Sequence, residues 1–239
     1  MTQDEFHRLV HLVIDSPAKP PETLFAGGMD NWHARARLAH FLATPELNKD
    51  ENHIPEAKEL FRSIVEEQVD DEKSEDVEEK VFALQKLSEL EKRDENEQEQ
   101  ALKHIDQAIE LAESTDFLYK YMLRGELWAD RWNLMHQMDM TKDAEAEVDE
   151  RIAAYQDIPI EHNSYLYYGY RFKAQLAAER GVTLVAKDYM HMAIHSMEIP
   201  PEYQEGIDKA FAATHDNAAW ILRDVDLATP NPDHLHWDI

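Results

Sequence analysis

Hydrophobic residues recur along most of the chain at intervals of three and four positions, and short polar stretches separate the runs that they form. This interval places the apolar side chains on one face of an α-helix, whereas no segment alternates as a half-buried strand does. The prolines fall within the polar stretches, several of them in clusters such as "SPAKPPETLFAGGMDN" and "EIPPE". The pattern therefore predicts an all-α chain of about ten helices, joined in pairs by short turns.

Nearly the same spacing occurs in four of these helices: a small residue, a bulky residue four positions later and, in two of the four, a second small residue three positions after that. The four sets are Ala57, Phe61 and Ile64; Ala101, Ile105 and Ala108; Ala144 and Val148, with Arg151 in the place of the second small residue; and Ala186, Met190 and Ala193. The three positions share one helix face, where small side chains let a neighbouring helix approach closely. The spacing predicts helices that pack against one another in a repeating array.

The helices before the last two sets carry matching residues. Ala174 lies twelve positions before Ala186 and one turn after Tyr170, and Gly181 falls between the two helices. One unit earlier, "YKYMLRGELW" places Tyr121, Gly125 and Trp128 at equivalent positions. The chain thus resembles the tetratricopeptide repeat (TPR) family, whose unit is a helix–turn–helix of about 34 residues. The resemblance implies a right-handed α–α superhelix of helical hairpins.

The resemblance also implies a domain organisation. We expect one TPR-like repeat domain over residues 1–226, with units at about 32–69, 77–113, 118–155 and 167–200 and a capping helix at 201–226. Residues 227–239 contain two prolines and no helical period, so we expect an irregular tail there. The first three units contain extra residues, such as "TPELNKDENHIP", which predict an irregular superhelix.

The charge of the chain narrows the choice of partners. It has 50 acidic and 24 basic residues, which give a formal net charge of −26. This charge repels phosphate backbones and anionic membrane surfaces, so we expect neither nucleic acid nor membrane as a partner. No apolar run approaches the roughly 20 residues that span a bilayer, and the N-terminus lacks the apolar centre of a secretory signal. We therefore expect a cytoplasmic acidic protein.

Two histidine clusters are candidate metal sites. Asp188, His191 and His195 stand at helical spacing, but on a helical wheel they lie opposite the repeat face of the same helix. Two exposed histidines and one carboxylate lack the further ligands that hold a functional metal. His136 lies among Met135, Met138 and Met140, which are more typical of helix packing than of a soft-metal site. We expect no metal at either place.

Motifs of catalysis are not found in the sequence. The chain has no cysteine, no glycine-rich phosphate loop, no nucleophile elbow, no HExxH and no Glu-x-x-His. The repeats also use up most of the chain and leave little room for a catalytic domain. We therefore expect neither a cofactor nor an enzymatic activity, and a metal-dependent enzyme is kept only as an alternative.

The resemblance implies a protein–protein interaction scaffold that binds a partner segment in a concave groove. By register, the groove residues are Tyr119, Met122, Glu126 and Asp130 in the third unit and Tyr168, Arg171, Gln175 and Glu179 in the fourth. Tyrosine and arginine are common among the residues that dominate binding energy, and an acidic wall favours a basic or neutral segment with a bulky apolar residue. Two alternatives stay open: some of these side chains pack against the next unit, or the protein is a peptide-sensing regulator that acts on another protein.

Overall fold

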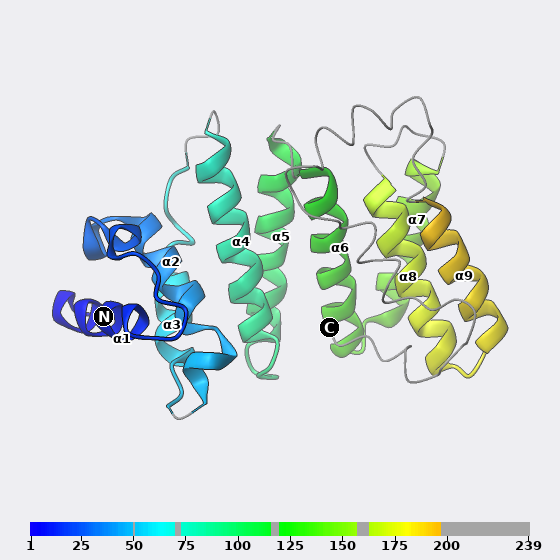
Figure 1. Cartoon of the computed structure of the whole chain (residues 1–239). Helices are drawn as coiled ribbons and strands as arrows, with labels where there is room; N and C mark the ends of the chain where they lie inside the picture. The colour runs from blue at the N-terminus through cyan, green and yellow to red at the C-terminus, as the bar shows by residue number, and fades with distance from the viewer. Residues whose placement is uncertain (50, 70–72, 116–119, 157–162, 197–239) are drawn as a thin grey trace. The chain divides into compact units, whose positions relative to one another are not determined.

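The computed structural model describes residues 1–49, 51–69, 73–115, 120–156 and 163–196 (Figure 1). These residues contain nine α-helices, which pack in sequential antiparallel fashion, and no strand occurs among them. The prediction of an all-α chain is therefore confirmed. The chain divides into two compact units, Met1–Lys120 and Tyr121–Ile239.

The first unit contains five α-helices. They are α1 (Gln3–Ile14), α2 (Trp32–Leu42), α3 (Ile54–Arg62), α4 (Ser74–Glu91) and α5 (Gln98–Ser114). Helix α2 packs with α3 and α4 packs with α5, while α4 also contacts both α2 and α3. A single buried core joins α1, α2, α3 and α4, with Phe6, Leu38 and Phe61 among its largest side chains.

Local sequence explains where the first helices begin. The Thr2 hydroxyl accepts a hydrogen bond from the Glu5 backbone and the Glu5 carboxylate accepts one from the Thr2 backbone, which is a capping box. The Asn31 side chain caps α2 by accepting from the backbone of His33. Between α1 and α2, the stretch that the sequence marks only as a break forms two short 3-10 helices, η1 (Glu22–Phe25) and η2 (Gly28–Asp30). A third, η3 (Pro45–Asn48), follows α2.

The second unit contains four α-helices: α6 (Lys120–Gln137), which begins at the boundary, α7 (Thr141–Tyr155), α8 (Asn163–Glu179) and α9 (Thr183–Ser196). Helix α8 packs against α7 and α9. It also lies against α6, because a methyl group added at Gly125 would come within 2.5 Å of the Ser164 backbone. Between α8 and α9, Gly181 has a φ of 74°, a left-handed conformation that glycine adopts without strain.

The residues that carry the repeated spacing lie where the sequence predicts. All the small and bulky members of the four sets are buried, and Arg151 is the one member that stays partly exposed. On α9, Asp188, His191 and His195 are exposed on the face opposite the buried set. The assignment of the α9 faces from the helical wheel is therefore confirmed.

Other sequence predictions concern residues that the structure does not describe. The proposed capping helix at 201–226 and the tail at 227–239 lie outside the described residues, so both stay predictions. The single repeat domain over 1–226 is likewise a prediction, and each unit is treated by itself below. Within the described ranges, no helix combines the length and the apolar character needed to cross a membrane.

Candidate binding face on helices α6 and α8

Six of the eight predicted groove residues have described side chains, and all six lie in the second unit. Glu126 and Asp130 are on α6, whereas Tyr168, Arg171, Gln175 and Glu179 are on α8. Met122 lies on α6, but its side chain is outside the description, and Tyr119 lies outside the described residues altogether. We refer to the six described residues as the α6–α8 face.

Tyr168 is the centre of the first half of this face. Its ring is partly buried, packs against Tyr167 and Ala193, and meets the Tyr167 ring edge-on at 5.0 Å between centroids. Burial raises the pKa of the Tyr168 hydroxyl, and the negative charges of Glu126 and Asp130 raise it further, while Arg171 lowers it. These interactions show that the structure brings three charged groups from two helices around one tyrosine. The hydroxyl is therefore held neutral, as a hydrogen-bond donor and acceptor.

The second half of the face is a chain of hydrogen bonds. The Gln175 amide donates to the Glu179 carboxylate at 3.0 Å, and the other Glu179 oxygen lies 3.0 Å from Nε2 of His136. Nδ1 of His136 lies 2.8 Å from the hydroxyl of Thr141 at the start of α7. The chain thus links α8 to α6 and then to α7. His136, which the sequence suggested only as a metal candidate, therefore joins Glu179 of this face to Thr141 of α7.

Close packing between α6 and α8 holds in place the two helices that carry the α6–α8 face. The Trp132 ring lies 6.1 Å from the ring of Phe172, and both rings are buried. Two turns away along α6, Gly125 provides the space for the Ser164 backbone. Because the two helices are held at both places, their facing side chains have a fixed spacing.

Arg151 departs from the repeat pattern and lies among aromatic rings. Its guanidinium carbon is 3.8 Å from the Trp128 ring centroid, 5.6 Å from that of Tyr165 and 6.0 Å from that of Tyr155. The Tyr155 and Tyr165 rings stack on each other at 4.5 Å. The long side chain therefore joins α7 to α6 and α8 by cation–π contacts, where the repeat would have a small residue. In the sequence, the signal for this cluster is Arg151 itself, because the repeat spacing predicts a small residue at that position.

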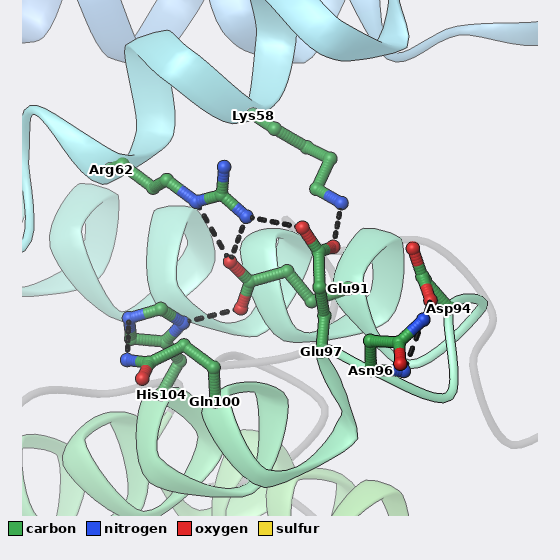
Figure 2. Close-up of polar contacts among 8 residues, drawn as sticks. All are labelled: Lys58, Arg62, Glu91, Asp94, Asn96, Glu97, Gln100 and His104. Atoms are coloured by element: carbon green, nitrogen blue, oxygen red, sulfur yellow. Dashed lines mark hydrogen bonds and ion pairs between the residues drawn. The ribbon is translucent and has the colours of Figure 1, made fainter.

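The first unit contains an ion-pair network around a buried carboxylate, which sequence reasoning missed (Figure 2). One oxygen of Glu91 accepts from Nε and Nη2 of Arg62 at 3.0 and 2.8 Å, and the other lies 2.7 Å from Nδ1 of His104. The far nitrogen of His104 is 3.0 Å from the Gln100 amide. The Glu91 side chain is 0% exposed, so this carboxylate is out of reach of a substrate. Its position between α3, α4 and α5 indicates a structural role.

Among the described residues, no group of three or more histidine, aspartate or glutamate side chains is arranged to hold a metal ion. Comparisons of the chain with protein-family models, with curated proteins and with solved structures found no match. What the α6–α8 face offers chemically is a half-buried tyrosine, an arginine, and a set of carboxylates of which one is tied to histidine. These groups are suited to hydrogen bonding and ion pairing with another molecule.

Proposed function

We propose that the chain is a TPR-like repeat protein whose role is binding rather than catalysis, and that the α6–α8 face receives a segment of a partner protein. The helix contacts within each unit support the repeat arrangement. Helix α4 contacts α2, α3 and α5, and α8 contacts α6, α7 and α9. In both units, the first helix of a hairpin therefore packs on both helices of the preceding hairpin and on its own partner, as stacked repeats do.

The observation that carries the proposal is the setting of Tyr168. A tyrosine fixed by packing on one side and surrounded by charges on the other offers apolar contact and a hydrogen bond together. Because its ring is already partly buried, little side-chain entropy is lost when a partner covers it. Such pre-organised aromatic residues, together with arginine, are those whose truncation costs most at protein interfaces.

The charge of the face gives the chemistry of the partner. Glu126, Asp130 and Glu179 contribute three carboxylates, against the single guanidinium of Arg171, on a chain whose net charge is −26. A basic or neutral segment would be drawn to this face, whereas an acidic one would be repelled. A bulky apolar residue of the segment would pack against the Tyr168 ring. The peptide-sensing regulator uses the same face, so one experiment tests both versions.

The experiment compares partner capture by the full chain and by single variants. Tyr168→Ala and Arg171→Ala are expected to weaken retention of a captured protein at least about tenfold, whereas Tyr168→Phe, which keeps the ring, should weaken it less. Lys187→Ala on α9 is the matched control and should bind normally. Circular dichroism and thermal melting first establish that each variant is folded.

Three results would contradict the proposal. They are that no protein is retained reproducibly, that the retained proteins bind Tyr168→Ala and Arg171→Ala normally, or that the Lys187→Ala control loses binding equally. If Tyr168→Ala unfolds, Tyr168 stabilises the core. Retention of the captured protein by Arg171→Ala would then decide whether the α6–α8 face binds it.

A further inference from the structure

One buried amide on α6 has an unpaired oxygen. Asn133 is 8% exposed, and its side-chain oxygen is enclosed without a hydrogen-bond partner in the described part of the chain. The other buried side-chain atom left unpaired in the described second unit is the indole nitrogen of Trp132, whose ring is fully buried near Phe172. Buried polar groups are almost always hydrogen-bonded, because an unpaired one has lost its bonds to water without replacement. The Asn133 amide therefore points to a ligand as the source of the missing bond.

The helical repeat of α6 places Asn133 between the two halves of the α6–α8 face. Successive residues of a helix are about 100° and about 1.5 Å apart, so Asn133 lies about 60° and about 4.5 Å from Asp130 on one side and from His136 on the other. Asp130 is one of the charges around Tyr168, and Nε2 of His136 lies 3.0 Å from the Glu179 carboxylate. A segment that covers both halves of the face therefore passes over Asn133.

A side-chain amide matches the hydrogen-bonding groups of a peptide backbone. Asparagine carries a donor and an acceptor side by side, and an extended segment presents the same two groups, N–H and C=O. In an α-helix these backbone groups are paired with one another, so a helical partner has none to offer along its length. The terminal torsion of asparagine is broad and roughly two-fold, so the Asn133 oxygen can turn from its enclosed position towards a bound segment.

We propose that the partner of the α6–α8 face binds as an extended segment, and that the Asn133 amide pairs with a backbone peptide group of that segment. This pairing rests on the proposed function and adds the conformation of the partner segment to its charge. Backbone hydrogen bonds contribute affinity whatever the side chains are, so Asn133 would hold the segment in place while Tyr168 and the carboxylates select its residues. The bond also removes the free-energy cost of the unpaired oxygen.

Substitution of Asn133 separates binding from stability. The probe is the tightest-binding member of a library of short random peptides selected on the full chain. Asn133→Leu keeps the branched shape of the side chain but removes both amide groups, so the dissociation constant of this peptide should rise about tenfold. The melting temperature of the free variant should stay the same or rise, because a buried unpaired acceptor is replaced by an apolar group. If Asn133→Leu does not fold, Asn133→Ala takes its place.

An amide-to-ester scan of the peptide tests the backbone bond itself. Each ester replaces one N–H by an oxygen, so it removes one backbone donor and leaves the side chains unchanged. At one position the ester should weaken binding to the unchanged chain about tenfold but have little further effect on Asn133→Leu, since both changes remove the same bond. Gln156→Leu, which removes an exposed amide at the end of α7, is the matched control and should bind the peptides normally.

The results distinguish failure of this pairing from failure of the proposed function. If no peptide binds, or if the selected peptide binds Tyr168→Ala and Arg171→Ala normally, both are overturned. If binding depends on Tyr168 but not on Asn133, or if no ester position is coupled to Asn133→Leu, the pairing alone is overturned. It is equally overturned if Gln156→Leu weakens binding as much, or if circular dichroism shows that the peptide becomes helical when it binds.

Discussion

Helices α4 and α8 have equivalent neighbours, but the residues that they bury are of different kinds. Each packs on the two helices before it and the one after it within its own unit. Helix α4 buries a carboxylate, Glu91, between an arginine and a histidine, whereas α8 buries aromatic and small residues, with Phe172 and Ala174 among them. Equivalent helix packing is thus achieved by directional polar bonds in one unit and by ring packing in the other.

The difference predicts how each unit responds to substitution. A buried carboxylate is stable only while its partners are present, because its desolvation is offset by their charges and hydrogen bonds. Packed rings and close backbones depend instead on volume and shape. The first unit should therefore be sensitive to loss of charge, and the second to added or removed volume.

The largest expected effect is the loss of the buried carboxylate. Glu91→Ala should destabilise the first unit by about 3–5 kcal/mol, because it leaves His104 buried without its acceptor and removes the main partner of Arg62. Native-state hydrogen exchange would show faster exchange in α3, α4 and α5.

The control for Glu91→Ala lies in the same network. Glu97 pairs with both Lys58 and Arg62 but is more exposed (Figure 2), so Glu97→Ala should cost no more than about 1 kcal/mol. Equal effects of the two variants would mean that burial of Glu91 does not decide the stability of this junction.

The next effect depends on pH and concerns His40 on α2. Burial, together with the positive charge of Lys86, lowers the pKa of His40 from 6.5 to about 4, and its ring packs edge-on against Phe61. As the pH falls, His40 is protonated at a higher pH in the unfolded chain than in the folded chain. The contribution of His40 to the free energy of unfolding is therefore complete above about pH 6.5 and decreases as the pH falls towards 4. The loss attributable to His40 should be about 3 kcal/mol by pH 4.

Denaturant unfolding at several pH values, compared with His40→Phe, isolates this contribution. The variant keeps an aromatic ring against Phe61 and cannot be protonated, so the free energy of unfolding should decrease less with falling pH. His11→Phe on α1 is the control at an exposed position. An identical pH dependence in His40→Phe and the unchanged chain would disprove the assignment.

In the second unit, added volume should matter more than lost charge. Gly125→Ala should cost about 1–3 kcal/mol, because the new methyl group would lie 2.5 Å from the Ser164 backbone and α6 and α8 must separate. Gly169→Ala is the matched control, since its methyl group would meet the Ile152 side chain at 3.1 Å, which can move. Melting temperatures that rank the two variants in the opposite order would contradict the close contact of α6 and α8.

The smallest expected effect is at Arg151. Arg151→Met keeps most of the side-chain volume but removes the cation, so the second unit should lose about 0.5–2 kcal/mol. Arg151→Lys keeps a charge without the planar group, so its stability should lie between that of Arg151→Met and that of the unchanged chain. If Arg151→Met is as stable as the unchanged chain in chemical denaturation, the rings around it are held by packing alone.

Much of the helical pattern could be predicted from the sequence. The expected unit start at about residue 32 and the break at Gly181 agree with the start of α2 and with the turn between α8 and α9, since glycine and capping residues act locally. The small–large–small spacing identified buried residues on α3, α5, α7 and α9 because it reports one helix face.

The polar chemistry between helices could not be predicted. Glu91 and His104 are thirteen positions apart on different helices, and a chain with 50 acidic residues offers many such pairs. Their contact depends on the exact rotation of α4 against α5, which hydrophobic periodicity does not determine. For the candidate site, the register placed Tyr168 near Glu126 and Asp130, but it did not foresee that His136 ties Glu179 to α6.

The central claim is that a partner segment binds on the α6–α8 face, and hydrogen exchange of the full chain with and without a retained partner tests it most directly. Binding there should slow exchange in residues 126–130 of α6 and 168–179 of α8 and leave α3, α4 and α5 unchanged. It should be lost with Tyr168→Ala. Slower exchange confined to the first unit, or to α9, with α6 and α8 unchanged, would contradict the account.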